Sequence, residues 1–347
     1  MFKHLIIRSF YPLSILWGVI TLCFILFYVF PDADELVVGQ RSDLQTKQAI
    51  KEELGLDKPA FARYIHYLKH LSPISVESKN NIVETNINIG VSATSALVIK
   101  FPDFGLSYQN RKPVVSILLE ALVGTLTLAG VAMLLAFFMG IVLGTIAALN
   151  YNSIADSVIL AFSTLFISIP SFFSSILIAW LFGFVWHQYT GLPMTGSLFS
   201  IDLETGNQIL TLENLVLPAL ALAVRPVAVI TQLMRSSLLG VLQSDYIRTA
   251  KAKGLSPNKL IVRHALKNAL NPVITAASGW FASMMAGAFF VEYIFNWKGL
   301  GKVLIESVQL SDLPVVSGGV IYIAIIFIAV NSLVNISYQY LDPKLKK

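Results

Sequence analysis

Two long stretches of this chain carry no charged side chain. No Asp, Glu, Lys or Arg occurs between Ala121 and Ala155, or between Ser157 and Ile201. About 20 apolar residues are enough for one helix to cross a bilayer. Charged residues make up only 13% of the whole chain, against about 25% in soluble domains. The sequence therefore predicts an all-α polytopic membrane protein.

The apolar segments predict six transmembrane helices. The first lies with the N-terminal tail in residues 1–30, and a core domain of residues 113–347 holds the other five. These five are expected near residues 114–148, 154–186, 214–240, 271–296 and 313–340.

Charge in the connecting segments predicts the orientation, because cytoplasmic loops of membrane proteins collect Lys and Arg. The segment 187–213 has acidic residues and no Lys or Arg, so it is expected outside. The basic segment 235–267 and the basic tail 342–347 are expected inside, which puts both termini inside. The same rule accounts for the net charge of +5, so no nucleic-acid partner is expected.

Residues 31–112 are polar and are predicted to form a small extracytoplasmic α+β insertion between the first two spans. Residues 61–71 have the pattern of a short amphipathic helix, and residues 80–100 favour a β-hairpin. His66 and His70 share one face of that helix. No acid lies between them, so an amphipathic surface helix is the simpler interpretation and no metal site is predicted.

A polar island, residues 245–272, carries the signals of two short helices joined by a tight turn. Gly254 supplies the left-handed backbone that often ends a helix. Ser256 and Pro257 follow as an N-cap and a first helical residue, which restart a helix. The prediction is a cytoplasmic helical hairpin with the apolar Leu255 at its tip and basic flanks, suited to a groove on a partner protein.

Ionisable residues inside spans are candidates for function. Arg225 lies near the middle of the fourth span and has two interpretations. It either faces a water-filled path and meets an anionic substrate group, or it pairs with Glu120, with Glu292 or with carbonyls freed by Pro226. Glu292 and Asp156 lie near span ends and are interpreted as groups solvated at the membrane interface.

The third predicted span contains Ser168, Pro170 and Ser171. A proline loosens a helix, and serines can then line a polar path. Close packing of helices through small residues is the alternative. With Arg225, these three residues form the candidate translocation path.

Several motifs of catalysis are missing. The sequence has no glycine-rich phosphate loop ending in Gly-Lys-Ser/Thr, no His-Glu-x-x-His and no Gly-x-Ser-x-Gly. No catalytic residue, metal ligand or ATP site is therefore predicted in this chain. A self-contained secondary transporter or channel is the alternative function, although no inverted repeat is visible. An intramembrane enzyme would need paired aspartates or a Ser/His set, and neither is evident.

Residues 245–255 read DYIRTAKAKGL, and residues 263–272 read RHALKNALNP. Together they resemble the cytoplasmic EAA loop of ABC importer permeases, in the form found in dipeptide and oligopeptide permeases of the B type. Segments such as 290–295 (FVEYIF), 299–301 (GLG) and 341–343 (LDP) resemble the same family. The general loop begins Glu-Ala-Ala, where this chain has Arg248, Thr249 and Ala250, and residues 72–100 look like an insertion. Within a coupling loop of residues 241–270, the resemblance assigns ATPase coupling to Asp245, Arg248, Thr249, Ala250, Lys253, Gly254, Leu255, Ser256, Pro257, Arg263 and His264.

This resemblance implies a type I importer fold and a bacterial cytoplasmic (inner) membrane location. The chain would be one of two homologous permease subunits that form the translocation path through the lipid bilayer. Two cytoplasmic ABC ATPase subunits would hold ATP and Mg²⁺ and receive the hairpins as coupling helices, so this chain would bind no cofactor itself. An extracytoplasmic solute-binding protein would deliver peptides or similar small solutes.

Overall fold

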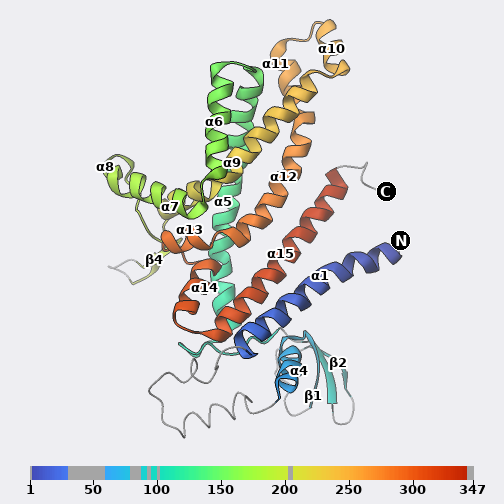
Figure 1. Ribbon diagram of the computed structural model, residues 1–347, viewed down its shortest axis with the longest axis vertical. Helices are drawn as coiled ribbons and strands as arrows, with labels where there is room; N and C mark the ends of the chain where they lie inside the picture. The colour runs from blue at the N-terminus through green and yellow to red at the C-terminus, as the bar shows by residue number, and fades with distance from the viewer. Residues whose placement is uncertain are drawn as a thin grey trace. The chain divides into compact units, whose positions relative to one another are not determined.

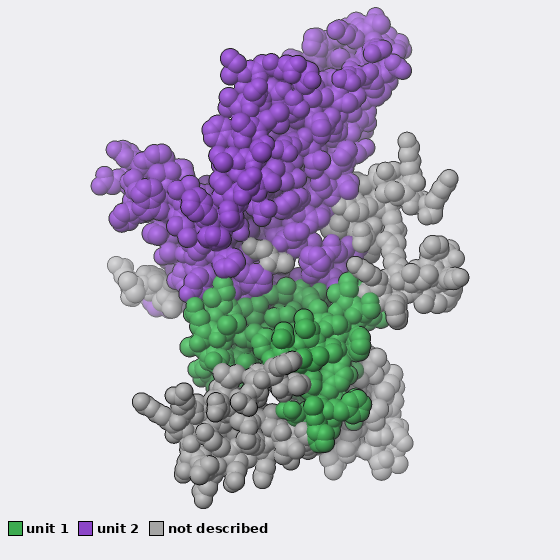
Figure 2. Space-filling view, viewed as in Figure 1, with its two compact units in different colours: residues 1–119, 304–325 green, residues 120–303, 326–347 purple. Residues whose placement is uncertain are grey.

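The computed structural model describes residues 2–29, 59–78, 87–91, 95–99, 102–201 and 206–341. It is mostly helical and divides into two compact units (Figures 1 and 2). Unit 1 comprises residues 1–119 and 304–325, and unit 2 comprises residues 120–303 and 326–347. Residues 31–58 of the predicted extracytoplasmic insertion lie outside the described residues, and so does the basic tail 342–347.

Unit 1 contains the first helix and the described part of the predicted insertion. Its elements are α1 (Phe2–Phe24), the π-helical turn η1 (Ile25–Val29), α4 (Ala60–Leu71), β1 (Ile74–Ser78), β2 (Ile87–Val91) and β3 (Ser95–Ile99). The predicted amphipathic helix is present as α4, and the predicted hairpin is present as β2 and β3. The prediction missed β1, which pairs with β3 on its other side to give an antiparallel sheet of order β1-β3-β2.

A buried carboxylate joins two distant segments of unit 1. Ser107 donates its hydroxyl hydrogen to Asp312 Oδ2 at 2.5 Å, and the Tyr108 backbone N–H donates to Asp312 Oδ1 at 3.0 Å. Both Ser107 and Asp312 are buried. The chain just before α5 (Val114–Leu149) is thus held against the chain just before α15 (Leu313–Leu341).

Unit 2 is built mainly from helices. After α5, which like α14 and α15 has residues in both units, the elements are α6 (Ile154–Ser168), α7 (Ser171–Ile178), η3 (Ala179–Val185), α8 (His187–Thr190), β4 (Phe199–Ile201), β5 (Gln208–Leu210), α9 (Glu213–Leu242), α10 (Asp245–Ala252), α11 (Pro257–Lys259), η4 (Leu260–Ala265), α12 (Leu266–Gly287), α13 (Phe289–Ile294) and α14 (Leu300–Gln309).

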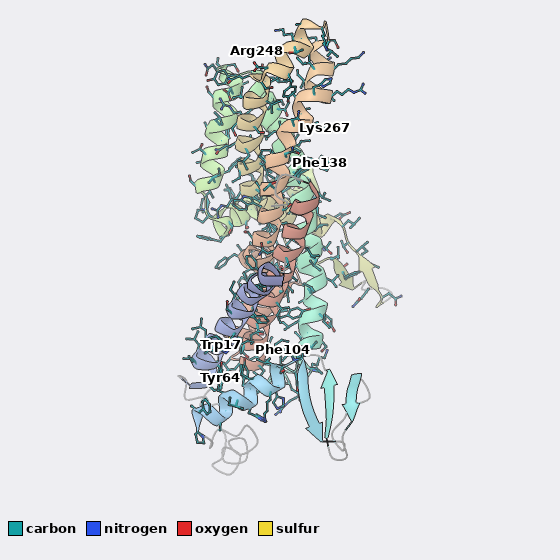
Figure 3. The ribbon with its side chains drawn as sticks, turned by 90° about the vertical axis from the view of Figure 1, so that its right-hand side faces the viewer. Trp17, Tyr64, Phe104, Phe138, Arg248 and Lys267 are labelled. Carbon is teal, nitrogen blue, oxygen red and sulfur yellow. The ribbon has the colours of Figure 1, made fainter. Side chains whose placement is uncertain are left out.

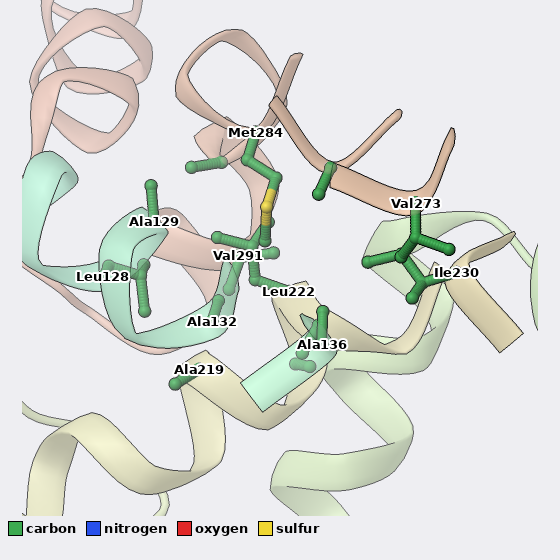
Figure 4. Packing of buried hydrophobic residues seen from close by; sticks show 14 of the residues in the cluster. Leu128, Ala129, Ala132, Ala136, Ala219, Leu222, Ile230, Val273, Met284 and Val291 are labelled. Carbon is green, nitrogen blue, oxygen red and sulfur yellow. The ribbon is translucent and has the colours of Figure 1, made fainter. Parts of the chain in front are cut away.

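Helix α5 approaches α9 closely because small residues line the contact. Ala136, Gly140 and Gly144 fall four residues apart on α5, and Figure 4 shows Ala136 and Ile230 within this core. A Cβ atom at Gly140 would lie 2.5 Å from Ile230 Cγ2, and one at Gly144 would lie 2.5 Å from the Thr231 carbonyl oxygen. Small residues at this spacing let membrane helices pack with their backbones close together.

Three described helices are long and apolar enough to cross a membrane: α5, α9 and the 313–333 part of α15. A fourth candidate is α6 followed by α7 and η3, but this pair is bent by 109°. The span predicted over 154–186 is therefore divided at this bend into two helical parts. Ile169 is extended and Pro170 opens α7, because proline disfavours a helical conformation in the residue before it. The count of six spans stays a prediction.

Candidate functional site

The predicted helical hairpin is present between α9 and α12. Its first arm is α10, and its second arm is α11, which continues through η4 into α12 without a break in the helical chain. The hairpin lies at the same end of unit 2 as the turn between α5 and α6 (Figure 1). Because its two arms adjoin α9 and α12, a displacement of the hairpin would act directly on these two long helices of unit 2.

The turn of the hairpin depends on Gly254, whose φ of +81° lies in the left-handed region. The Gly254 N–H donates to the Lys251 carbonyl at 3.0 Å, and the Leu255 N–H donates to the Ala250 carbonyl at 3.4 Å. This pair of bonds is the Schellman arrangement, which satisfies the last carbonyls of a helix and favours glycine at this position. The predicted role of Gly254 as the helix terminator is confirmed.

The start of the second arm was only half predicted. Ser256 takes the N-cap position and Pro257 the first helical position, as expected. The Ser256 side chain makes no capping hydrogen bond, however. Proline has no N–H at a position where the helix would leave that group unpaired, and it fixes φ for the helix, so Pro257 favours this helix start without help from the hydroxyl.

The hairpin is anchored by apolar and polar contacts near its base. Ile247 and Leu260 are buried, one from each arm. Asn268 donates its side-chain N–H to the Tyr246 hydroxyl at 2.8 Å. Ser237 of α9 donates its hydroxyl hydrogen to the Ala269 carbonyl of α12 at 2.9 Å, which joins the two helices that carry the hairpin.

The outer surface of the hairpin is basic. Its exposed charged side chains, of which Arg248 is labelled in Figure 3 together with Lys267 at the start of α12, are Asp245, Arg248, Lys251, Lys253, Lys259, Arg263 and Lys267. Asp245 is the one acid among them and lies 3.7 Å from Arg248, with both side chains largely exposed. Exposed pairs of this kind contribute little to stability. Thr249 and Ser256 are also exposed, whereas Ala250, Leu255 and His264 are half-buried.

Arg235 is not part of this basic surface, although the sequence suggested that it was. Its guanidinium Nε and Nη2 donate to Asp156 Oδ1 and Oδ2 at 2.6 and 2.7 Å. The Asp156 side chain is 3% exposed and that of Arg235 is 18% exposed. The guanidinium also lies 5.4 Å from the centre of the Tyr151 ring. The interpretation of Asp156 as a solvated interfacial group is therefore wrong.

This ion pair joins the α5–α6 turn to the end of α9 that leads into the hairpin. Asp156 also accepts the Asn152 backbone N–H at 3.0 Å, and Ser153 caps α6. A bidentate pair between a guanidinium and a carboxylate fixes geometry as well as distance. The sequence did carry a signal that Asp156 has a specific partner, because it is the single charged residue between Ala121 and Ile201.

Glu292 is a second functional-site candidate that was placed wrongly at the membrane interface. It is fully buried in α13. Thr125 donates its hydroxyl hydrogen to Glu292 Oε1 at 2.7 Å, and the Gly301 and Lys302 backbone N–H groups donate to Oε2 at 2.7 and 3.2 Å. The last two donors belong to the first turn of α14, where a negative charge is favoured. A Cβ atom at Gly299 or Gly301 would overlap this carboxylate.

Arg225 does not form the pairs that were considered for it. Its side chain is exposed and makes no hydrogen bond or ion pair with any described residue. Glu120 instead accepts from Lys298 Nζ at 3.2 Å, and Glu292 has the partners given above. The pairing of Arg225 with either acid is therefore wrong, and no described carbonyl accepts from it either. Its place in a polar path stays a prediction.

The other candidate path residues lie at the bend between α6 and α7. Ser168 and Pro170 are exposed, and Ser171 is half-buried. The Ser168 hydroxyl donates to the Thr164 carbonyl at 3.0 Å, and the Ser171 carbonyl accepts from the neighbouring Ser174 and Ser175 hydroxyls. The Ser168 hydroxyl is thus bonded locally, and the role of these residues in a path stays a prediction.

Comparison with protein families identifies the kind of protein. The family described as "binding-protein-dependent transport system inner membrane component" matches residues 140–347, and the N-terminal family of such membrane components matches residues 1–129. The chain belongs to this family. The resemblance to ABC importer permeases is confirmed, and the chain is a multi-pass membrane permease subunit of an ABC importer. This membership argues against a self-contained secondary transporter or channel.

Individual relatives are similar over almost their whole length. The dipeptide transport system permease protein DppB of Escherichia coli K12 is 33% identical, over 95% of this chain and 94% of its own. DppB of Bacillus subtilis is 34% identical over 100% of this chain and 98% of its own. The glutathione transport system permease protein GsiC of Escherichia coli O1:K1 is 29% identical over 100% of this chain and 99% of its own.

Among solved structures, the inward-facing MetNI methionine ABC transporter has a chain that matches with a TM-score of 0.52. Sequence identity is 15%, and the match covers 66% of this chain and 97% of that chain. At this level of identity the likeness concerns the fold alone. It agrees with the mostly helical importer fold that the hairpin motif implied.

The first prediction concerns the buried ion pair. Asp156→Asn leaves Arg235 without its anionic partner, and we expect it to destabilise the protein by about 1.5–3 kcal/mol, the range for hydrogen bonds to charged groups. Thermal unfolding of the purified protein in detergent, followed by tryptophan fluorescence, measures this loss. Replacing both partners, as in Asp156→Asn with Arg235→Met, should recover much of the stability because no unpaired charge remains.

Asp245→Asn is the matched control, since it removes the acid of an exposed pair and should change stability by less than about 0.5 kcal/mol. Equal unfolding temperatures for Asp156→Asn and Asp245→Asn would show that the buried pair has no structural role.

Proposed function

We propose that this chain is one of two homologous permease subunits in an ATP-driven importer of peptides or similar small solutes. The dipeptide permeases among its relatives support this substrate class. An extracytoplasmic solute-binding protein delivers the solute, and two ABC ATPase subunits hold ATP and Mg²⁺. The complex resides in the bacterial cytoplasmic membrane, with six spans of this chain and both termini inside.

The observation that carries the proposal is the basic hairpin of residues 245–265, which is anchored at its base and exposed at its outer surface. We propose that this hairpin inserts into a groove of an ATPase subunit. Its exposed Lys and Arg side chains suit acidic groups around such a groove, and the half-buried Leu255 adds an apolar contact at the turn. An element held only by exposed polar contacts would not transmit force in this way.

Coupling requires that the hairpin bind the two states of the ATPase dimer with different affinity, because otherwise ATP binding would not shift the permease. Closure of the dimer on ATP would move the hairpin. Since η4 continues into α12 and α10 follows α9 after two residues, the movement reaches both helices. The Asp156–Arg235 pair then connects α9 to the α5–α6 turn. This series of contacts supports an alternating-access mechanism.

Exposed Arg225, followed by Pro226 in α9, is proposed to face the solute path together with the α6–α7 bend. A guanidinium there would meet an anionic group of the solute, such as a peptide carboxylate. Ser168, Pro170 and Ser171 at the bend would contribute polar groups to the same path.

Two variants, Gly254→Pro and Leu255→Asp, test whether the hairpin couples the permease to the ATPase. The first removes the N–H that bonds the Lys251 carbonyl and forbids the left-handed backbone, and the second puts a charge on the apolar contact. We expect each variant to abolish uptake of a labelled dipeptide in cells that contain the whole importer, with normal amounts of the chain in the membrane.

Gly254→Asn and Leu255→Met are the matched controls and should keep most of the uptake. Asparagine tolerates the left-handed backbone, and methionine preserves the apolar contact. Uptake by Gly254→Pro or Leu255→Asp at the level of these controls would exclude the hairpin as the coupling element.

A separate prediction concerns Arg225. Arg225→Ala should reduce uptake of peptides with an additional carboxylate at least about tenfold more than uptake of neutral peptides, which corresponds to about 1.4 kcal/mol of selective binding. Arg225→Lys keeps the positive charge and should retain most of the preference. Competition uptake with paired acidic and neutral peptides makes the measurement, and an equal loss for both classes would refute a role in the solute path.

A further inference from the structure

Helix α4 in unit 1 carries two exposed histidines on successive turns, His66 and His70. Their Nε2 atoms lie 3.2 Å apart, with ring centres separated by 4.5 Å. At this separation one Nε2 carries a hydrogen and donates it to the other, and a metal ion would take the place of that hydrogen. The sequence alone gave only the spacing of the two residues and led to no metal site.

The distance between the two nitrogens fits joint binding of one metal ion. Zinc–imidazole bonds are about 2.0–2.1 Å long, and bond angles of about 90–110° at the metal then separate two ligand nitrogens by roughly 2.9–3.4 Å. The observed 3.2 Å falls within this range.

Asp103 supplies the support that metal-binding histidines usually have. Its Oδ2 lies 3.5 Å from His70 Nδ1, the ring nitrogen that does not approach His66. A carboxylate at Nδ1 favours the tautomer in which Nδ1 carries the hydrogen, so that the Nε2 lone pair can bind a metal. Asp103 is itself held in place, because its backbone N–H donates to the His70 carbonyl at 3.1 Å and its Oδ1 accepts the Gly105 N–H at 2.9 Å.

We propose that His66 and His70 form a binding site for a divalent transition-metal ion, with Asp103 as a positioning residue. Imidazole nitrogen favours Zn²⁺, Cu²⁺ and Ni²⁺, whereas Mg²⁺ and Ca²⁺ prefer oxygen ligands. The described residues contain no group of three or more His, Cys, Asp or Glu side chains that could hold a metal. With two imidazole ligands, a four-coordinate ion would take its other ligands from water or from a group of another molecule.

The test uses the full chain purified in detergent without a polyhistidine tag. Zn²⁺ is titrated in competition with a chelating dye, which gives the number of ions bound and the affinity. Electron paramagnetic resonance of bound Cu²⁺ then reports nitrogen ligands directly. We expect one high-affinity ion per chain and a copper spectrum with coupling to two imidazole nitrogens.

His66→Ala and His70→Ala should each weaken Zn²⁺ binding at least about tenfold, and Asp103→Asn should weaken it by about 10–100-fold while the number of ions stays the same. His187→Ala removes another exposed histidine and should leave the affinity unchanged. His66 and His70 are exposed, so the unfolding temperatures of their variants should stay close to that of the unmodified protein. His187, whose Nδ1 lies 2.8 Å from the Leu192 carbonyl oxygen, serves as the control for binding only. Unchanged Zn²⁺ affinity in the His66→Ala and His70→Ala double variant, or a copper spectrum without nitrogen coupling, would overturn the proposal.

Discussion

The main constraint on this chain is that a carboxylate removed from water must be met by specific donors. Three acids in the described residues are enclosed, and each has such partners. Asp156 receives the Arg235 guanidinium, Glu292 receives the Thr125 hydroxyl and two N–H groups of α14, and Asp312 receives Ser107 and an N–H group. Each acid joins segments that are distant in sequence. Apolar packing in a membrane is weakly directional, so these polar contacts fix how the segments meet.

The hairpin combines an exposed contact surface with a fixed base. Its outer side is exposed and basic, while Ile247, Leu260 and the Tyr246–Asn268 bond hold its arms together. The second arm is continuous with α12, and the first follows α9 after two residues. A subunit that moves the hairpin would thus move helices rather than a loose loop. This is the physical basis for proposing that energy from ATP enters the permease here.

Local signals in the sequence predicted local structure well. Gly254 and Pro257 determine backbone angles by their own chemistry, so the hairpin could be predicted from these residues and their immediate neighbours. The buried acids were placed wrongly because their partners are remote: Arg235 lies 79 residues from Asp156, and Thr125 lies 167 residues from Glu292. A rule that places charged residues at the membrane interface because they lie near span ends considers each residue by itself, so it cannot identify a remote partner. The bend at Pro170 was anticipated as a loosening, but its size depends on packing that no local pattern specifies.

The central claim is that the hairpin is where ATPase subunits bind, and co-purification tests it most directly. The chain would be extracted from its native membranes in mild detergent, and every protein that remains bound would be identified by mass spectrometry. We expect a second permease and ABC ATPase subunits to co-purify with the unmodified chain, and the ATPases alone to be lost when the hairpin turn is disrupted. Recovery of the chain by itself, stable and able to move solute into liposomes without ATP, would contradict it.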